Sequence, residues 1–165
     1  MMKLRLLLFE ECNRNCLGCC NKDWNLDSLE KETAYEKYDE ILLTGGEPLL
    51  KSTFVINTIY KIRKTSNAPI FVYTAKVDNL TDIFSVLDVS DGLTVTLHEQ
   101  SDVYPFNTFN NALLIKNING KSLRCNIFKD IKINLSDYPL WVIKNNIEWI
   151  KNCPLPENEV FKRIY

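Results

Sequence analysis

The chain has 165 residues and a formal net charge of −1, and 45% of its residues are hydrophobic. That length supports one domain with a real core and is too short for two ordinary ones, so residues 1–165 are expected to form a single domain. A net charge this close to zero gives no electrostatic reason to expect binding to nucleic acid or to an acidic membrane. The apolar run at 4–9 is too short for a signal sequence or a membrane span, so a cytoplasmic location is expected.

Short apolar runs alternate with stretches of helical periodicity along most of the chain. The predicted strands are 3–9, 40–43, 69–73, 93–97 and 123–128. The predicted helices are 29–38, 52–64, a segment around 80–87 and a segment within 106–117. For the first of these helices, Asp27 and Glu30 have the spacing of a capping box.

One segment of the C-terminal third has two possible secondary structures. Residues 131–135 fit either a sixth strand or an extended linker. Four apolar residues then recur at helical spacing and predict a further helix: Leu140, Ile143, Ile147 and Ile150. Two prolines in the segment that begins at Pro154 predict an extended tail.

Alternation of strand and helix predicts an α/β fold with a parallel sheet and right-handed crossovers. Two architectures satisfy that pattern, an open doubly wound sheet and a partial barrel. Hydrophobic periodicity does not separate them.

Three cysteines follow the first predicted strand directly, with the spacing C-x3-C-x2-C: Cys12, Cys16 and Cys19. Closely spaced thiols in a reduced compartment indicate a metal site. Structural zinc and standard ferredoxin clusters take four protein ligands, whereas three would leave one iron of a [4Fe-4S] cluster open to a small molecule. A zinc site completed by Cys20 or His98 is the alternative, although the chain has no second C-x2-C pair.

The other three cysteines are not expected to bind metal. Cys20 follows Cys19 directly, and adjacent cysteines seldom bind one ion without strain, so it is expected to pack beside the loop. Cys125 and Cys153 are isolated in the sequence and are expected to be buried thiols.

The spacing of the triplet resembles the radical S-adenosylmethionine (SAM) superfamily. A second signature of that superfamily, Gly-Gly-Glu-Pro, follows the next predicted strand as Gly45, Gly46, Glu47 and Pro48. The resemblance implies an abbreviated, partial (β/α)6 barrel with mostly parallel strands. It also implies a [4Fe-4S] cluster bound by the three cysteines and SAM bound at the open iron. The glycines would let the backbone approach the methionine ammonium of SAM, and Glu47 would supply negative charge nearby.

Polar residues at the ends of later strands are further candidates for binding SAM. Chemistry in β/α proteins lies at the carboxyl ends of the strands. Thr74 and His98 end predicted strands, and Asn126 lies in the second half of another. By analogy with the family they would bind the ribose and carboxylate of SAM, and a purely structural role is the alternative for His98.

The resemblance also implies a reaction. An external one-electron reductant, of flavodoxin or ferredoxin type, would reduce the cluster. Reductive cleavage of SAM would give methionine and a 5′-deoxyadenosyl radical that abstracts hydrogen from a substrate. Because the cofactors carry this chemistry, no further catalytic residue is assigned.

The segment from Cys16 to Trp24 resembles the activating proteins of anaerobic ribonucleotide reductases, which implies a glycyl-radical protein as substrate. That likeness covers only the first fifth of the chain. Two alternatives stay open. One is a small-molecule or peptide-modifying enzyme similar to 7-carboxy-7-deazaguanine synthase. The other is a non-catalytic iron–sulfur protein that transfers electrons or binds a partner.

Overall fold

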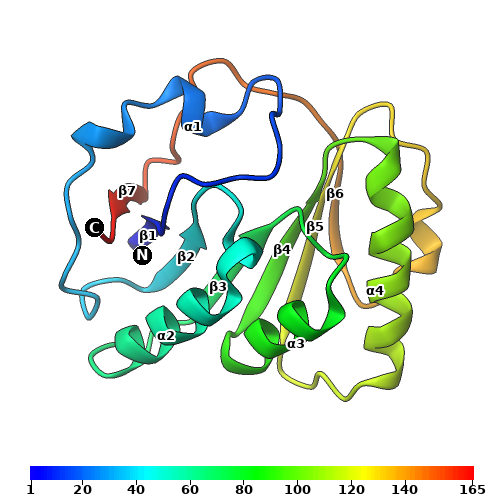
Figure 1. Ribbon diagram of the computed structural model, residues 1–165, viewed down its shortest axis with the longest axis horizontal. Helices are drawn as coiled ribbons and strands as arrows, with labels where there is room; N and C mark the ends of the chain where they lie inside the picture. Colours follow the sequence, from blue (N-terminus) through cyan, green and yellow to red (C-terminus); the bar gives the residue numbers. More distant parts are fainter.

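A computed structural model describes residues 1–165 and has one seven-stranded, all-parallel sheet at its centre (Figure 1). The strands lie in the order β6-β5-β4-β3-β2-β1-β7. Their bounds are β1 Lys3–Leu7, β2 Glu40–Thr44, β3 Ile70–Thr74, β4 Gly92–Leu97, β5 Ser122–Phe128, β6 Val142–Ile147 and β7 Glu159–Arg163. The predicted α/β class and parallel sheet are therefore confirmed.

Three helices of ten or more residues connect the central strands: α2 Ser52–Arg63, α3 Leu80–Val89 and α4 Val103–Ile115. From β1 to β6 each new strand is added on the same side of the last one. Right-handed crossovers that always advance in one direction place their helices on one face of the sheet. A doubly wound sheet reverses direction and covers both faces, so this sheet is instead compatible with a partial barrel. We call its helix-free face the inner face.

Alternating strand residues build the core between the sheet and these helices. Leu4 and Leu6 of β1 are fully buried, and so are Val55, Ile59 and Ile62, which form one stripe along α2. They belong to a single contiguous cluster of 28 buried residues. Such a stripe at helical spacing is what stabilises a helix against a sheet, and the helix predicted at 52–64 is confirmed as α2.

The predicted helix at 29–38 and its capping box are wrong. A short 3-10 turn, η1 Leu26–Ser28, precedes this segment, and residues 29–38 themselves form irregular chain with no helix. The buried Glu32 carboxylate accepts hydrogen bonds from the backbone N–H groups of Thr33 and Ala34. The backbone around it also pairs with β7, where Glu32 N donates to Arg163 O at 2.8 Å. These bonds offer the backbone an alternative to helix.

The helix predicted from Leu140 to Ile150 is also wrong, because these residues form strand β6 on the open edge of β5. The β5–β6 register shifts near the end of the strand, and Asn146 has a φ of 55°. This irregularity turns neighbouring apolar residues to opposite faces. Ile143 packs against the core, whereas Ile147 lines the cavity on the inner face.

The C-terminal segment supplies a seventh strand where five or six were expected. The predicted extended tail pairs with β1 as β7, and residues 131–134 form a linker ahead of the short turn η4 Leu135–Asp137. Residues 148–158, which we call the strap, cross from β6 to β7 (Figure 1). Because this connection runs back in the opposite direction, the right-handed rule places it on the inner face. No helix in the structure is long and apolar enough to cross a membrane.

Candidate functional site

A cavity of about 330 Å³ lies on the inner face, at the carboxyl ends of the strands. Its lining includes every residue that the sequence analysis proposed for a site, from five different strands or the loops after them. These residues are Cys12, Cys16, Cys19, Gly45, Gly46, Glu47, Thr74, His98 and Asn126. The fold therefore brings together side chains that are more than a hundred residues apart in sequence.

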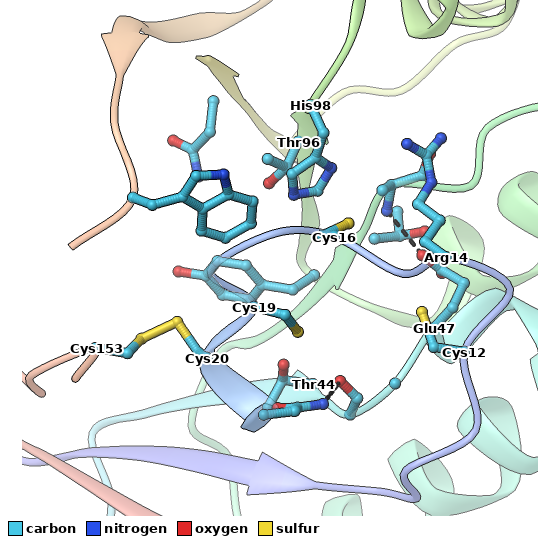
Figure 2. A pocket seen from close by; sticks show the side chains of 18 of the residues that line it. Cys12, Arg14, Cys16, Cys19, Cys20, Thr44, Glu47, Thr96, His98 and Cys153 are labelled. Carbon is cyan, nitrogen blue, oxygen red and sulfur yellow. Dashed lines mark hydrogen bonds between the residues drawn. A yellow bond between two sulfur atoms is a disulfide. The ribbon is translucent and has the colours of Figure 1, made fainter. Parts of the chain in front are cut away.

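The three cysteines of the triplet lie on one segment, residues 8–19, which we call the cysteine loop (Figure 2). All three are free thiols, and Cys12 is exposed while Cys16 and Cys19 are partly buried. Burial raises the pKa of the Cys16 thiol, and the nearby Arg14 charge opposes that shift. No group of three or more His, Cys, Asp or Glu side chains has the arrangement of a metal site. The loop would therefore have to draw its thiols together around a bound metal.

The remaining cysteines differ from expectation in one respect. Cys125 is a buried thiol beneath the helices, as predicted. Cys153 is not an isolated buried thiol, because it forms a disulfide with Cys20, and their Cα atoms are 5.3 Å apart. Both lie beside the cavity (Figure 2).

Arg14 attaches the first half of the cysteine loop to the end of β4. Its Nη1 and Nη2 groups donate to Asp102 Oδ2 and Oδ1 at 3.0 and 2.5 Å. Asp102 is buried in the turn η3 Gln100–Asp102, where Oδ2 also accepts hydrogen bonds from the N–H groups of His98 and Glu99. A bidentate, largely buried pair of this kind fixes geometry as well as charge.

The Gly-Gly turn lies directly against the start of the cysteine loop. Gly46 N donates to Phe9 O at 2.7 Å, and Glu47 N donates to Glu11 O at 2.9 Å. A Cβ atom on Gly46 would fall well inside contact distance of the Glu11 carbonyl, and one on Gly45 would lie 2.6 Å from Phe9 O. Only glycine permits this approach of two backbones.

Glu47 binds protein groups with both of its carboxylate oxygens. Oε1 accepts hydrogen bonds from Leu49 N at 3.0 Å and Thr74 Oγ1 at 2.5 Å, and Oε2 accepts one from Ala75 N at 2.9 Å. Burial raises the pKa of Glu47, and these three donors oppose the rise. Glu47 therefore ties the end of β2 to the end of β3. The Thr74 hydroxyl also accepts a hydrogen bond from Lys76 N, so its hydrogen bonds too are made within the protein.

His98 directly follows β4 and lies in an aromatic group with residues of β5 and the strap. Its ring stacks on Trp149 at 5.4 Å and on Phe128 at 5.1 Å between centroids. Burial, followed by the Arg14 charge, lowers the pKa of His98, which favours the neutral imidazole at pH 7. Its buried Nδ1 atom has no hydrogen-bond partner.

The strap covers the second half of the cysteine loop. Trp149 lies so close to Gly18 that a Cβ atom there would be 2.8 Å from its Cγ. Trp24 Nε1 donates a hydrogen bond to Cys153 O at 3.1 Å. The floor of the cavity below carries an ion pair between Arg5 and Glu159, with a 2.6 Å N–O distance.

Sequence reasoning missed Arg14, Asp102 and the strap. Glu99 and Asp102 have the spacing of a capping box, and they form one. That spacing could have predicted the turn at Gln100–Asp102 from the sequence. The ion pair of Arg14 with Asp102 joins residues that are 88 positions apart, and no short sequence pattern predicts it. Cys20 and Cys153 are similarly remote, and two isolated cysteines do not predict a pair.

Neither the models of known protein families nor the curated protein sequences give a match to this chain.

Proposed function

We propose that the protein is a radical SAM enzyme whose cysteine loop binds a [4Fe-4S] cluster. One observation carries the proposal. Three free thiols on the loop after β1 line the same cavity as the Gly-Gly-Glu turn after β2. The donor set fits the cluster, because the three other cysteines are occupied by a disulfide or buried under the helices.

With SAM bound, such a cluster would supply reductive cleavage of the sulfonium and, through it, hydrogen abstraction from a substrate. The chain's own groups position and shield this chemistry. Cys12, Cys16 and Cys19 would bind iron as thiolates. The Arg14–Asp102 pair and the turn at Gly46 fix where the loop begins.

SAM would lie on the inner face, on the side of the cavity formed by β3, β4 and β5. His98 offers an unpartnered Nδ1 atom there, and Asn126 lies on the neighbouring strand. Glu47 and Thr74 are bonded to each other and would hold the turn in place beside SAM. In this proposal an external one-electron reductant completes the system, and a glycyl-radical protein is the substrate suggested by the segment from Cys16 to Trp24.

The contacts of Glu47 also support a second candidate, an iron–sulfur protein that only transfers electrons. Pro48 begins the turn η2 Pro48–Lys51, and Glu47 caps that turn through Leu49 N. The whole Gly-Gly-Glu-Pro sequence thus has a structural explanation that requires no SAM. Electron transfer needs only the thiolates.

The test is anaerobic reconstitution with iron and sulfide. We expect about four irons per chain, as for other thiolate-bound [4Fe-4S] clusters. Replacing Cys12, Cys16 or Cys19 by Ala should abolish the cluster, whereas Cys20→Ala, directly after the loop, is a matched control and should retain it. A variant of the triplet that kept a full cluster would overturn the ligand assignment.

SAM separates the two candidates. After reduction, a radical SAM enzyme should release methionine and 5′-deoxyadenosine, and SAM should change the electron paramagnetic resonance signal of the cluster. A stable cluster that neither responds to SAM nor cleaves it would leave electron transfer as the function.

A further inference from the structure

We propose that Cys20 and Cys153 form a reversible redox latch that fastens the strap over the cavity. The pair is separate from the metal-binding triplet and joins two segments that are 133 residues apart. Cys20 begins the short helix α1 Cys20–Asp23, directly after the cysteine loop, and Cys153 lies in the strap. The disulfide that forms on oxidation therefore links the end of the cysteine loop to the strap.

The strap has few other fixed attachments. Its backbone hydrogen bonds are the local ones from Cys153 N to Ile150 O and from Glu159 N to Pro156 O, and one from Lys3 N to Asn158 O at the end next to β7. Lys151 and Asn152 are exposed, and Ile150 is 66% exposed. Apart from the disulfide, the middle of the strap is held by the packing of Trp149 and by the indole hydrogen bond of Trp24, and its start carries an exposed ion pair between Glu148 and Lys129. Segments with so few backbone bonds open at low free energy.

The position of the pair suits reversible chemistry. Cys20 and Cys153 are both partly exposed at the cavity, in contrast to the fully buried Cys125. Accessible disulfides outside the core are the ones that exchange with small thiols. Reduction would free the strap without disturbing the hydrophobic core, because neither Cys20 nor Cys153 is one of its buried residues.

The oxidant is a low-molecular-weight disulfide such as oxidised glutathione. The thiolate of one cysteine attacks a glutathione sulfur, so the glutathione disulfide breaks and one glutathione thiolate leaves. The second cysteine thiolate then attacks the mixed disulfide, which forms the Cys20–Cys153 bond and releases the second glutathione. The two cysteines lose two electrons and two protons, and two reduced glutathione molecules gain them.

The proposed latch gives the cavity two states, one with the disulfide formed and one with both cysteines reduced. In the disulfide state Trp149 stays over His98 and Gly18, and access from the strap side is closed. In the dithiol state the strap can lift and open the cavity to a larger substrate. The nature of what enters rests on the proposed function, whereas the latch itself does not.

Metal-free, full-length protein tests the latch without any dependence on cluster or SAM. It is equilibrated in glutathione buffers from fully reduced to fully oxidised, alkylated and mapped by mass spectrometry. We expect one disulfide, Cys20–Cys153, that forms and disappears reversibly. In parallel, trypsin cleavage after the exposed Lys151 should be about tenfold faster for the reduced protein, because local opening governs cleavage.

Cleavage after the exposed Lys64, the residue that directly follows α2, serves as the internal reference and should not depend on redox state. Cys153→Ser should be cleaved rapidly in every buffer, whereas Cys125→Ala, which removes a free thiol outside the cavity, should keep the redox dependence of the wild type. Three results would each overturn the latch: a different cysteine pairing, a disulfide that glutathione does not reduce, or equal cleavage at Lys151 in both states.

Discussion

The two sides of the cavity are built from different interactions. One side, the ends of β2, β3 and β4, is held by buried polar contacts: Glu47 with Thr74 and Ala75, and Arg14 with Asp102. The other side, the strap, is held by a disulfide and by stacked aromatic rings. Directional bonds between strand ends define one geometry, whereas rings in contact and a single covalent link allow a segment to detach as a unit. The comparison indicates a fixed side that positions the cysteine loop and a movable side that covers it.

The largest expected effect concerns the fixed side. Asp102→Ala would leave Arg14 without its partner and would remove the acceptor of the N–H groups of His98 and Glu99. We expect the free energy of unfolding to fall by about 3 kcal/mol, since breaking a buried pair leaves a charge uncompensated. Urea unfolding followed by tryptophan fluorescence measures this change.

The control for Asp102 is Lys129→Gln, which removes an ion pair with Glu148 at the start of the strap. Both side chains are more than half exposed, so no measurable change is expected. Equal effects of the two substitutions would contradict the division into a fixed and a movable side.

Gly46→Ala should have the next largest effect. The new methyl group would collide with the Glu11 backbone and displace the start of the cysteine loop. We expect a loss of about 2–3 kcal/mol, as for an overpacked site, again from urea unfolding. Gly120→Ala is the matched control because its Cβ would meet nothing within 4 Å, so only the penalty of its φ of 80°, about 1 kcal/mol, remains.

Trp149→Ala addresses the movable side. Loss of the two ring contacts with His98 and Phe128 should lower the free energy of unfolding by about 1–2 kcal/mol. It should also expose His98 and raise its pKa toward the ordinary value of about 6.5. The chain has one histidine, so a nuclear magnetic resonance titration gives an unambiguous signal. An unchanged pKa would show that Trp149 does not shield the ring.

The smallest effect is the pH dependence that His98 gives to the wild-type protein. Because burial lowers the pKa of His98 in the folded state, the unfolded chain takes up this proton first as the pH falls. Its contribution to stability is therefore complete above about pH 6.5 and is lost between that pH and the lower folded pKa, by at most about 1.4 kcal/mol per pH unit. His98→Gln should flatten this part of the stability–pH curve. A curve that the substitution leaves unaltered would contradict the assignment.

Local patterns predicted the part of the fold where strands and helices alternate. The stripe of Val55, Ile59 and Ile62 has one explanation, a helix against a sheet, and the structure agrees. Leu140 to Ile150 has a similar stripe, but the open edge of β5 and an irregularity at Asn146 make it a strand. Tertiary pairing outweighed local periodicity there, and no local signal reports which edge is open.

The candidate site divides in the same way. Residues next to predicted strands, such as Cys12, Gly46 and His98, could be assigned to one end of the sheet because parallel strands end together. What each side chain contacts could not be predicted. Glu47 was expected to supply charge near a ligand, and its oxygens accept hydrogen bonds from Leu49 N, the Thr74 hydroxyl and Ala75 N. Partners such as Arg14 and Asp102 depend on loops that meet only in the folded chain.

The pairing of β1 with β7 has a consequence for synthesis. β1 begins at Lys3 and its partner only at Glu159, so a nascent chain exposes the β1 edge until the later segment leaves the ribosome. The five strands from β2 to β6 can add to one edge of β1 in the order in which they are synthesised. The other edge of β1 stays unpaired until β7 is made. During that interval the cysteine loop has no cover, and its thiols are open to whatever donates metal or oxidises sulfur. During translation, the cysteine loop is therefore accessible before the strap that covers it has been synthesised.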